Sequence, residues 1–142
     1  FSERENSPKM WENYAEHHTG MRITYHFDEL PRCILEHFYP VQYEKEFFSC
    51  VHPDTLRNSE YFYLRKETKW KDEREWRFVY LTDNEHTISL ENCITEVCFG
   101  LRMDKNLRHS IVEAVKKAYP NRKIAFRQAT TGSRKLKIQE LK

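Results

Sequence analysis

Residues 94–118, ITEVCFGLRMDKNLRHSIVEAVKKA, decide the fold that the sequence predicts. Ile94–Phe99 is rich in β-branched and aromatic residues, which is typical of a strand, and Gly100 marks its end. Asp104 is a suitable N-cap for a helix. The apolar residues that follow at helical spacing predict one amphipathic helix, and they are Leu107, Ile111, Ala114, Val115 and Ala118.

A β-hairpin is expected after this helix. Residues 123–128 and 135–141 alternate apolar and basic side chains, as half-buried strands do. The Thr130-Thr131-Gly132-Ser133 stretch between them is typical of a turn. The C-terminal end of the chain is therefore predicted to contain two antiparallel strands.

The first 27 residues predict a helix and then a strand. Ser7 and Pro8 are typical of a helix start, and Gly20 is typical of a helix end. Within that helix, one face would carry Trp11, Tyr14, Ala15 and His18. Residues 21–27 then alternate and predict a half-buried strand, with one face made by Met21, Ile23, Tyr25 and Phe27.

The middle of the chain gives weaker patterns. Residues 33–38 fit a helix or a strand, residues 41–43 predict a short strand, and Pro53-Asp54 opens a predicted helix towards Trp70. Residues 76–81 give the strongest strand pattern, and residues 88–90 predict a short strand. Together these elements predict an α+β fold with a mixed, mainly antiparallel sheet, an early helical insertion and one late amphipathic helix. With no linker or internal repeat, residues 1–142 are expected to form a single domain.

Cysteine usage and hydropathy bear on the compartment. The four cysteines form no CxxC pair and no dense regular pattern, so we expect reduced thiols and a cytoplasmic protein: Cys33, Cys50, Cys93 and Cys98. No apolar run approaches the roughly 20 residues that cross a bilayer, so no membrane span is expected. No metal site is expected either, because His17 and His18 would point apart on a helix.

Charge is distributed unevenly along the chain. Residues 116–142 hold nine Lys or Arg against one acid, Glu140, so the net charge of +2 leaves −6 on residues 1–115. A basic end fits an anionic partner such as a nucleotide or nucleic acid. The alternative is a solvated face of basic strands.

The run Glu73-Arg74-Glu75-Trp76-Arg77 is the predicted functional focus. Alternate side chains of a strand share a face, so Glu73, Glu75 and Arg77 would lie together at the charged end of a buried strand. A carboxylate fixed there could stabilise a developing positive charge or orient a ribose hydroxyl. The alternative is that the glutamates only form ion pairs with Arg74 or Arg77.

The aromatic helix face is the second candidate. Core packing is the ordinary role of such a face, while Tyr14 and His18 have polar tips that need partners when buried. In a purely structural interpretation, Trp11, Trp70 and Trp76 would form one core and the charges would only solvate it.

The motif order resembles a bacterial family catalogued as domain of unknown function two-nine-seven-one. The resemblance lies in Phe1-Ser2-Glu3, Trp11-x-x-Tyr14-Ala15-x-x-His18-x-Gly20, Lys66-x-x-x-Trp70-x-x-Glu73-x-Glu75-Trp76-Arg77 and Ile94-x-x-Val97-x-x-Gly100, and it covers nearly the whole chain. Family members usually carry a further N-terminal segment before the Phe-Ser motif, and this chain starts at that motif.

The fuller layout of that family looks like a divergent ADP-ribosyltransferase. The resemblance implies that Ser2 stands for the middle motif, that Glu75 is the catalytic acid and that Glu73 assists it. NAD would be a substrate, with no other cofactor, and a bacterial defence or toxin system would be the setting. Ligand-binding positions would be Ser2, Trp11, Tyr14, His18, Lys66, Trp70 and Arg77, with Lys66 and Arg77 holding phosphates or the carboxylates. The alternative function is a non-catalytic nucleotide or nucleic-acid binding module that uses the basic C-terminal hairpin.

Overall fold

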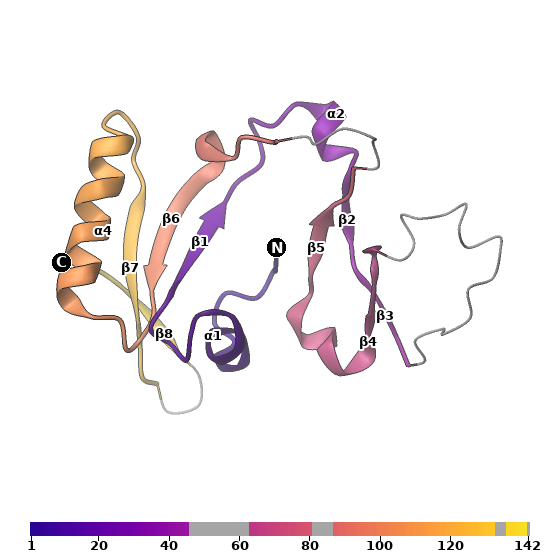
Figure 1. The fold of residues 1–142 in the computed structure, drawn as a ribbon, viewed down its shortest axis with the longest axis horizontal. Helices are drawn as coiled ribbons and strands as arrows, with labels where there is room; N and C mark the ends of the chain where they lie inside the picture. The colour runs from indigo at the N-terminus through magenta and orange to yellow at the C-terminus, as the bar shows by residue number, and fades with distance from the viewer. Residues whose placement is uncertain (46–62, 81–86, 133–135, 142) are drawn as a thin grey trace. The chain divides into compact units, whose positions relative to one another are not determined.

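The structure, a computed structural model, describes residues 1–45, 63–80, 87–132 and 136–141 (Figure 1). Its residues form two compact units. Unit 1 comprises Phe1–Glu5 and Leu30–Ile88, and unit 2 comprises Asn6–Glu29 and Ser89–Lys142. The single domain expected from the sequence stays a prediction. No helix in the described ranges combines the length and the apolar character that a membrane span needs.

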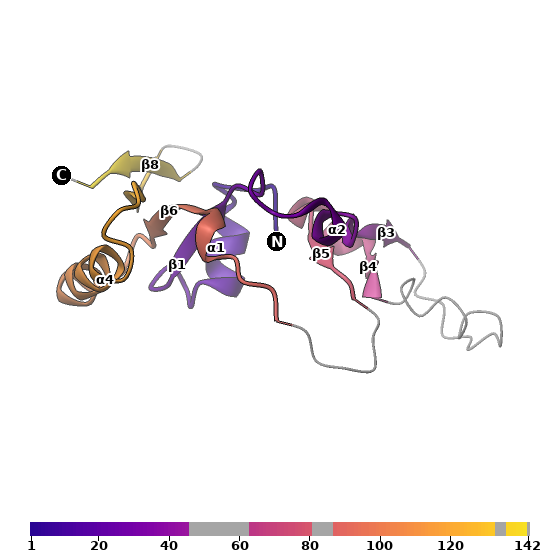
Figure 2. The same ribbon diagram turned by 90° about the horizontal axis from the view of Figure 1, so that it is seen from above.

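Unit 2 is built on a four-stranded sheet in the order β1-β6-β7-β8. The strands are β1 Met21–Tyr25, β6 Ile94–Phe99, β7 Ala125–Thr130 and β8 Lys137–Glu140. The β1–β6 and β7–β8 pairs are antiparallel and the β6–β7 pair is parallel. Helix α4, Lys105–Ala118, connects the two parallel strands and lies alongside the sheet (Figures 1 and 2).

Helix α4 begins as the sequence predicts. The Asp104 carboxylate accepts hydrogen bonds from the Asn106 and Leu107 backbone N–H groups, both at 2.9 Å, which satisfies two of the helix's unpaired donors. Its buried face differs from the predicted stripe, because Leu107 is 53% exposed and Ala114 and Ala118 are also exposed. Val112 is the buried helix residue, and it packs in a core with Val97, Phe99 and Met103.

Helix α1, Pro8–Tyr14, is shorter than predicted. Ser7 caps it as expected, with its hydroxyl accepting from the Met10 N–H at 3.4 Å. The helix ends at Tyr14 instead of Gly20, because Glu16, His17 and His18 have left-handed φ values of 47°, 52° and 70°. The predicted placement of His18 on the helix is therefore wrong.

Strand β1 alternates as predicted, but its apolar face is the less buried one. Met21 and Ile23 are 44% and 37% exposed, whereas Arg22 and Thr24 are partly buried. The reason is that Arg22 forms an ion pair with Glu96 of the neighbouring strand, while the core beside α4 is made chiefly by β6, β7 and the helix.

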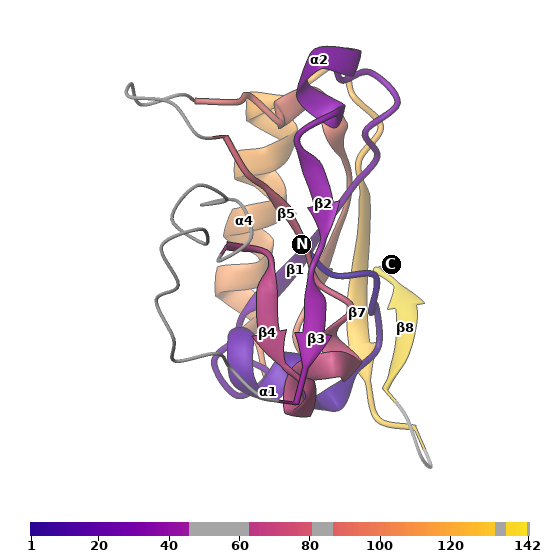
Figure 3. The same ribbon diagram turned by 90° about the vertical axis from the view of Figure 1, so that its right-hand side faces the viewer.

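Unit 1 consists of short elements, shown in Figure 3. They are α2 Arg32–Leu35, β2 Phe38–Pro40, β3 Gln42–Glu44, β4 Arg65–Glu67, the 3₁₀ helix η2 Thr68–Glu73 and β5 Trp76–Phe78. Strands β2 and β5 pair antiparallel, and β3 and β4 pair parallel. In Figure 3, β3 continues from β2, with β5 beside the first and β4 beside the second.

Some predictions for the middle of the chain differ from the structure, and others fall outside the described residues. The helix expected from Pro53 lies mostly outside the described residues, and its described end is wrong, because it forms strand β4 and the 3₁₀ helix η2. Residues 88–90 form no strand, and the 3₁₀ helix η3, Glu91–Cys93, follows them in unit 2. The predicted class is confirmed: the fold is α+β, with mixed, mainly antiparallel sheets, helices early in the chain and one late amphipathic helix.

Candidate functional site

The predicted strand face of Glu73, Glu75 and Arg77 forms by a different route. Strand β5 begins only at Trp76, and Glu73 is the last residue of η2. Arg74 adopts a left-handed conformation (φ 45°, ψ 56°), and its N–H donates to the Lys71 carbonyl. This turn brings both glutamates to one lysine, so the two carboxylates still lie together.

Lys66 of β4 is the residue that joins the two glutamates. Its Nζ lies 2.5 Å from Glu73 Oε2 and 2.9 Å from Glu75 Oε2. The Glu73 side chain is 7% exposed, and those of Lys66 and Glu75 are each 20% exposed. Glu75 is thus the more accessible carboxylate of the pair.

Arg77 binds Glu75 through two nitrogens. Its Nε lies 2.6 Å from Glu75 Oε1 and its Nη2 lies 3.0 Å from Oε2. Such bidentate pairs are stronger and more precisely oriented than single hydrogen bonds. Lys66, Glu73, Glu75 and Arg77 are named the carboxylate cluster below; their formal charges sum to zero.

The electrostatics of the cluster keep Glu75 ionised. Burial raises the pKa of the Glu75 carboxyl, but hydrogen bonds from Arg77 and Lys66 outweigh this, so the pKa lies below its ordinary value. Burial lowers the pKa of Lys66, but its bonds to Glu73 and Glu75 raise it above the ordinary value. At neutral pH Glu75 therefore acts as a fixed negative charge and not as a proton donor.

Ser2 lies beside the cluster. It forms an isolated antiparallel bridge with Glu75, and its Oγ donates to the Glu73 carbonyl at 2.5 Å. The neighbouring Glu3 N–H donates to the Arg74 carbonyl at 3.2 Å. The Phe1–Glu3 segment and the segment with the two glutamates are therefore adjacent.

Tyr43 is a contact that the sequence did not reveal. The Glu75 backbone N–H donates to the Tyr43 hydroxyl at 2.8 Å, and Tyr43 is the register partner of Lys66 in the parallel β3–β4 pair. Only that pairing places Tyr43 here, and no local pattern predicts a parallel pair between residues so far apart in sequence.

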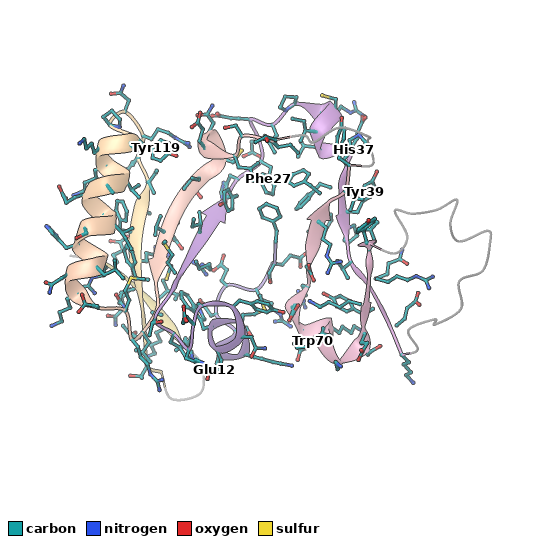
Figure 4. All side chains as sticks on the ribbon, in the orientation of Figure 1. Glu12, Phe27, His37, Tyr39, Trp70 and Tyr119 are labelled. Carbon is teal, nitrogen blue, oxygen red and sulfur yellow. The ribbon has the colours of Figure 1, made fainter. Side chains whose placement is uncertain are left out.

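Trp70 lies on η2 and is labelled in Figure 4. The ammonium groups of Lys66 and Lys69 lie 5.3 and 5.8 Å from its ring centroid, which is the range of cation–π attraction. The structure thus brings together, in unit 1, the predicted residues Ser2, Lys66, Trp70, Glu73, Glu75 and Arg77.

The other three predicted site residues belong to unit 2. Trp11 is 3% exposed and packs with Ala15, Cys98 and Ala129, so core packing is confirmed for it. Tyr14 is 58% exposed. His18 Nε2 lies 3.3 Å from a carboxylate oxygen of Glu12, which is labelled on α1 in Figure 4.

Some basic side chains of the C-terminal end bind to groups of the protein itself. Arg122 donates to the carbonyl oxygens of Glu91, Asn92 and Ile94. Arg127 Nε lies 3.0 Å from Glu96 Oε2. Lys123 and Lys137 are exposed. Nucleic-acid binding by this hairpin stays a prediction, and fewer basic side chains are available for it than the sequence indicates.

Within the described ranges, no group of three or more His, Cys, Asp or Glu side chains is arranged to hold a metal ion. Cys33 and Cys93 are free thiols.

Comparison of the chain with family models, with curated proteins and with solved structures gives no match.

Proposed function

We propose that the carboxylate cluster is the active site of an NAD-using, ADP-ribosyltransferase-like domain, with Glu75 as the residue that stabilises the transition state. The proposal includes membership of the family that the motifs resemble and a role in a bacterial defence or toxin system. The observation that carries it is the adjacency of Ser2 to Glu75, which puts a hydroxyl-bearing motif beside an ionised carboxylate.

The chemistry of the proposed reaction suits an ionised glutamate. The bond between ribose C1′ and the nicotinamide nitrogen breaks, and its electron pair leaves with neutral nicotinamide. Positive charge then develops on C1′ and the ring oxygen, which a fixed carboxylate stabilises. An acceptor hydroxyl, guanidine or water forms the new bond to C1′ and releases its proton to solvent.

Two further observations support the assignment of roles. Glu75 is partly exposed, whereas Glu73 is nearly buried, so Glu75 is the carboxylate that a ribose could reach. Free thiols at Cys33 and Cys93 fit a reducing compartment, and the proposal therefore places the protein in the cytoplasm.

The test measures the release of nicotinamide from NAD by chromatography. The reaction is run with and without a bacterial cell extract, which supplies acceptors. Glu75→Gln should reduce the rate by about 100-fold or more, which is the usual cost of losing one transition-state contact. Glu67→Gln is the matched control, because Glu67 pairs with exposed Lys69 and is 46% exposed; its rate should equal that of the wild type.

Two outcomes contradict the proposal. One is unchanged NAD after prolonged incubation with the wild-type protein and extract. The other is a Glu75→Gln protein that folds, as judged by circular dichroism, and releases nicotinamide at the wild-type rate.

A further inference from the structure

The sequence predicts that Lys66 holds either phosphates or the two carboxylates. The contacts in unit 1 support the second of these roles. We propose that Lys66 is a positioning residue that fixes Glu73 and Glu75 side by side and does not bind phosphate. The catalytic consequence rests on the proposed function, whereas the positioning itself is measurable without any activity.

The geometry gives Lys66 a partner on each carboxylate. Its ammonium lies within hydrogen-bonding distance of Glu73 Oε2 and Glu75 Oε2, at 2.5 and 2.9 Å. Two carboxylates this close repel each other, and a shared cation removes that repulsion. Lys66 therefore allows the two carboxylates to lie close together at one place.

The backbone around Lys66 holds it in register with the carboxylates. Lys66 pairs with Tyr43 across β3 and β4, and the Tyr43 hydroxyl accepts from the Glu75 backbone N–H. Tyr43 thus binds the main chain of Glu75, and its strand partner Lys66 binds the side chain of Glu75. The Trp70 ring packs against the same ammonium, with its centroid 5.3 Å away.

The charge balance of the cluster argues against the phosphate role. Lys66 and Arg77 together balance Glu73 and Glu75, so the carboxylate cluster has no excess positive charge to attract a phosphate. A phosphate that took Lys66 would leave a nearly buried Glu73 without this cation, which is costly in a partly desolvated site.

Lys69 is a matched control within the same unit. Its ammonium lies 5.8 Å from the same Trp70 ring, but its carboxylate partner is Glu67, at 2.6 Å, and its side chain is 61% exposed. Substituting Lys69 therefore removes a lysine beside Trp70 without touching Glu73 or Glu75.

The experiment is an NMR titration of the Glu75 side-chain carboxyl in ¹³C-labelled full chain, comparing wild type, Lys66→Met, Lys66→Arg and Lys69→Met. Lys66→Met should raise the pKa of Glu75 by about 1 unit, since a nearby opposite charge lowers a carboxyl pKa by roughly that much or more. Lys66→Arg should retain the low value, and Lys69→Met should match the wild type. A Glu75 titration unchanged by Lys66→Met in a folded protein overturns the proposal.

A second measurement uses the wild-type protein, so it tests the positioning role of Lys66 even if Lys66→Met does not fold. The ammonium hydrogens of Lys66 should exchange with water more slowly than those of Lys69 in ¹⁵N NMR, because both carboxylates hold them. Equal exchange rates for the two lysines overturn the proposal.

The binding of adenosine diphosphate separates the positioning role from the phosphate role. Lys66→Met should change its Kd less than twofold if Lys66 only positions the glutamates. A tenfold or larger loss of affinity with an unchanged Glu75 titration assigns Lys66 to phosphate and overturns the proposal. Absence of nicotinamide release, by contrast, counts against the proposed function and leaves the titration result intact.

Discussion

At the residue scale, Gly100 is a position where only hydrogen fits. A Cβ atom there would lie 2.2 Å from the His18 carbonyl oxygen and 2.8 Å from the Gly20 carbonyl oxygen. Both atoms are backbone, so a substitution must move the chain and not a side-chain tip. The Gly100 N–H also donates to the Gly20 carbonyl at 2.8 Å, which fixes the end of β6 against the turn after α1.

Gly100→Ala should therefore destabilise the protein by about 1–3 kcal/mol, the usual cost of forcing atoms into a packed region. Urea unfolding followed by circular dichroism measures this as a lower midpoint. Gly20→Ala is the comparison, because its Cβ would meet the Ala15 backbone at 3.1 Å, and its effect should be smaller. A Gly100→Ala protein with the wild-type midpoint would show that the His18 turn moves freely.

At the element scale, α4 depends on the charge of its N-cap. Hydrogen bonds from the Leu107 backbone lower the pKa of Asp104 below its ordinary value of 3.8. A carboxyl whose pKa is lower in the folded state stabilises the protein above its unfolded pKa. That contribution is lost as the pH falls through the folded value.

Asp104→Ala should accordingly lower the Tm at pH 7, and the difference from the wild type should shrink as the pH falls below about 4. Asp104→Asn keeps a capping oxygen that does not titrate, so the Tm of this variant should lack the acid-dependent change. A wild-type minus Ala difference that stays constant over this range would contradict a charge-dependent cap. Thermal unfolding by circular dichroism supplies all three curves.

Elements with strong local patterns were predictable from the sequence, and those made by distant contacts were not. The strand Ile94–Phe99 and the cap at Asp104 are found where the sequence places them, because composition and capping are local properties. The helix after Ser7 ends early at a run of left-handed residues, and the last of them, His18, lies against the Gly100 backbone. No local pattern predicts that contact.

The same distinction holds in the candidate site. Alternation correctly predicted that Glu73, Glu75 and Arg77 lie together, although the predicted strand is a 3₁₀ helix and a left-handed residue at that point. Lys66 and Tyr43 reach Glu75 through strand pairing, which depends on the fold of unit 1. Sequence spacing alone could therefore nominate the glutamates and Arg77, but not the contacts of Glu75 with Lys66 and Tyr43.

At the scale of the whole molecule, the two units differ in their buried cores. Among the described residues, the buried apolar side chains of unit 2 include Trp11, Val97, Cys98, Phe99 and Ala129, whereas those of unit 1 are Val41 and Val79. Stability is unevenly distributed when apolar burial is uneven, because regions with few buried contacts open more easily.

Native-state hydrogen exchange should reflect this difference. Hydrogen-bonded amides of β6 in unit 2 should exchange at least about 10-fold more slowly than those of β2 and β5 in unit 1, which corresponds to about 1.4 kcal/mol of opening free energy. Mass spectrometry of peptic fragments resolves the two regions. Equal protection of β5 and β6 would mean that both units open in one cooperative step.

The pairing of β1 with β6 also governs how the chain folds during synthesis. Tyr25 pairs with Ile94, so about 70 residues, including most of unit 1, separate the two strands in sequence. At roughly 5–20 residues per second, a ribosome delivers β6 on the order of 4–14 seconds after β1. During that interval β1 lacks the partner strand that it has in the folded sheet, whereas β6, α4 and β7 emerge one after another and form local contacts quickly.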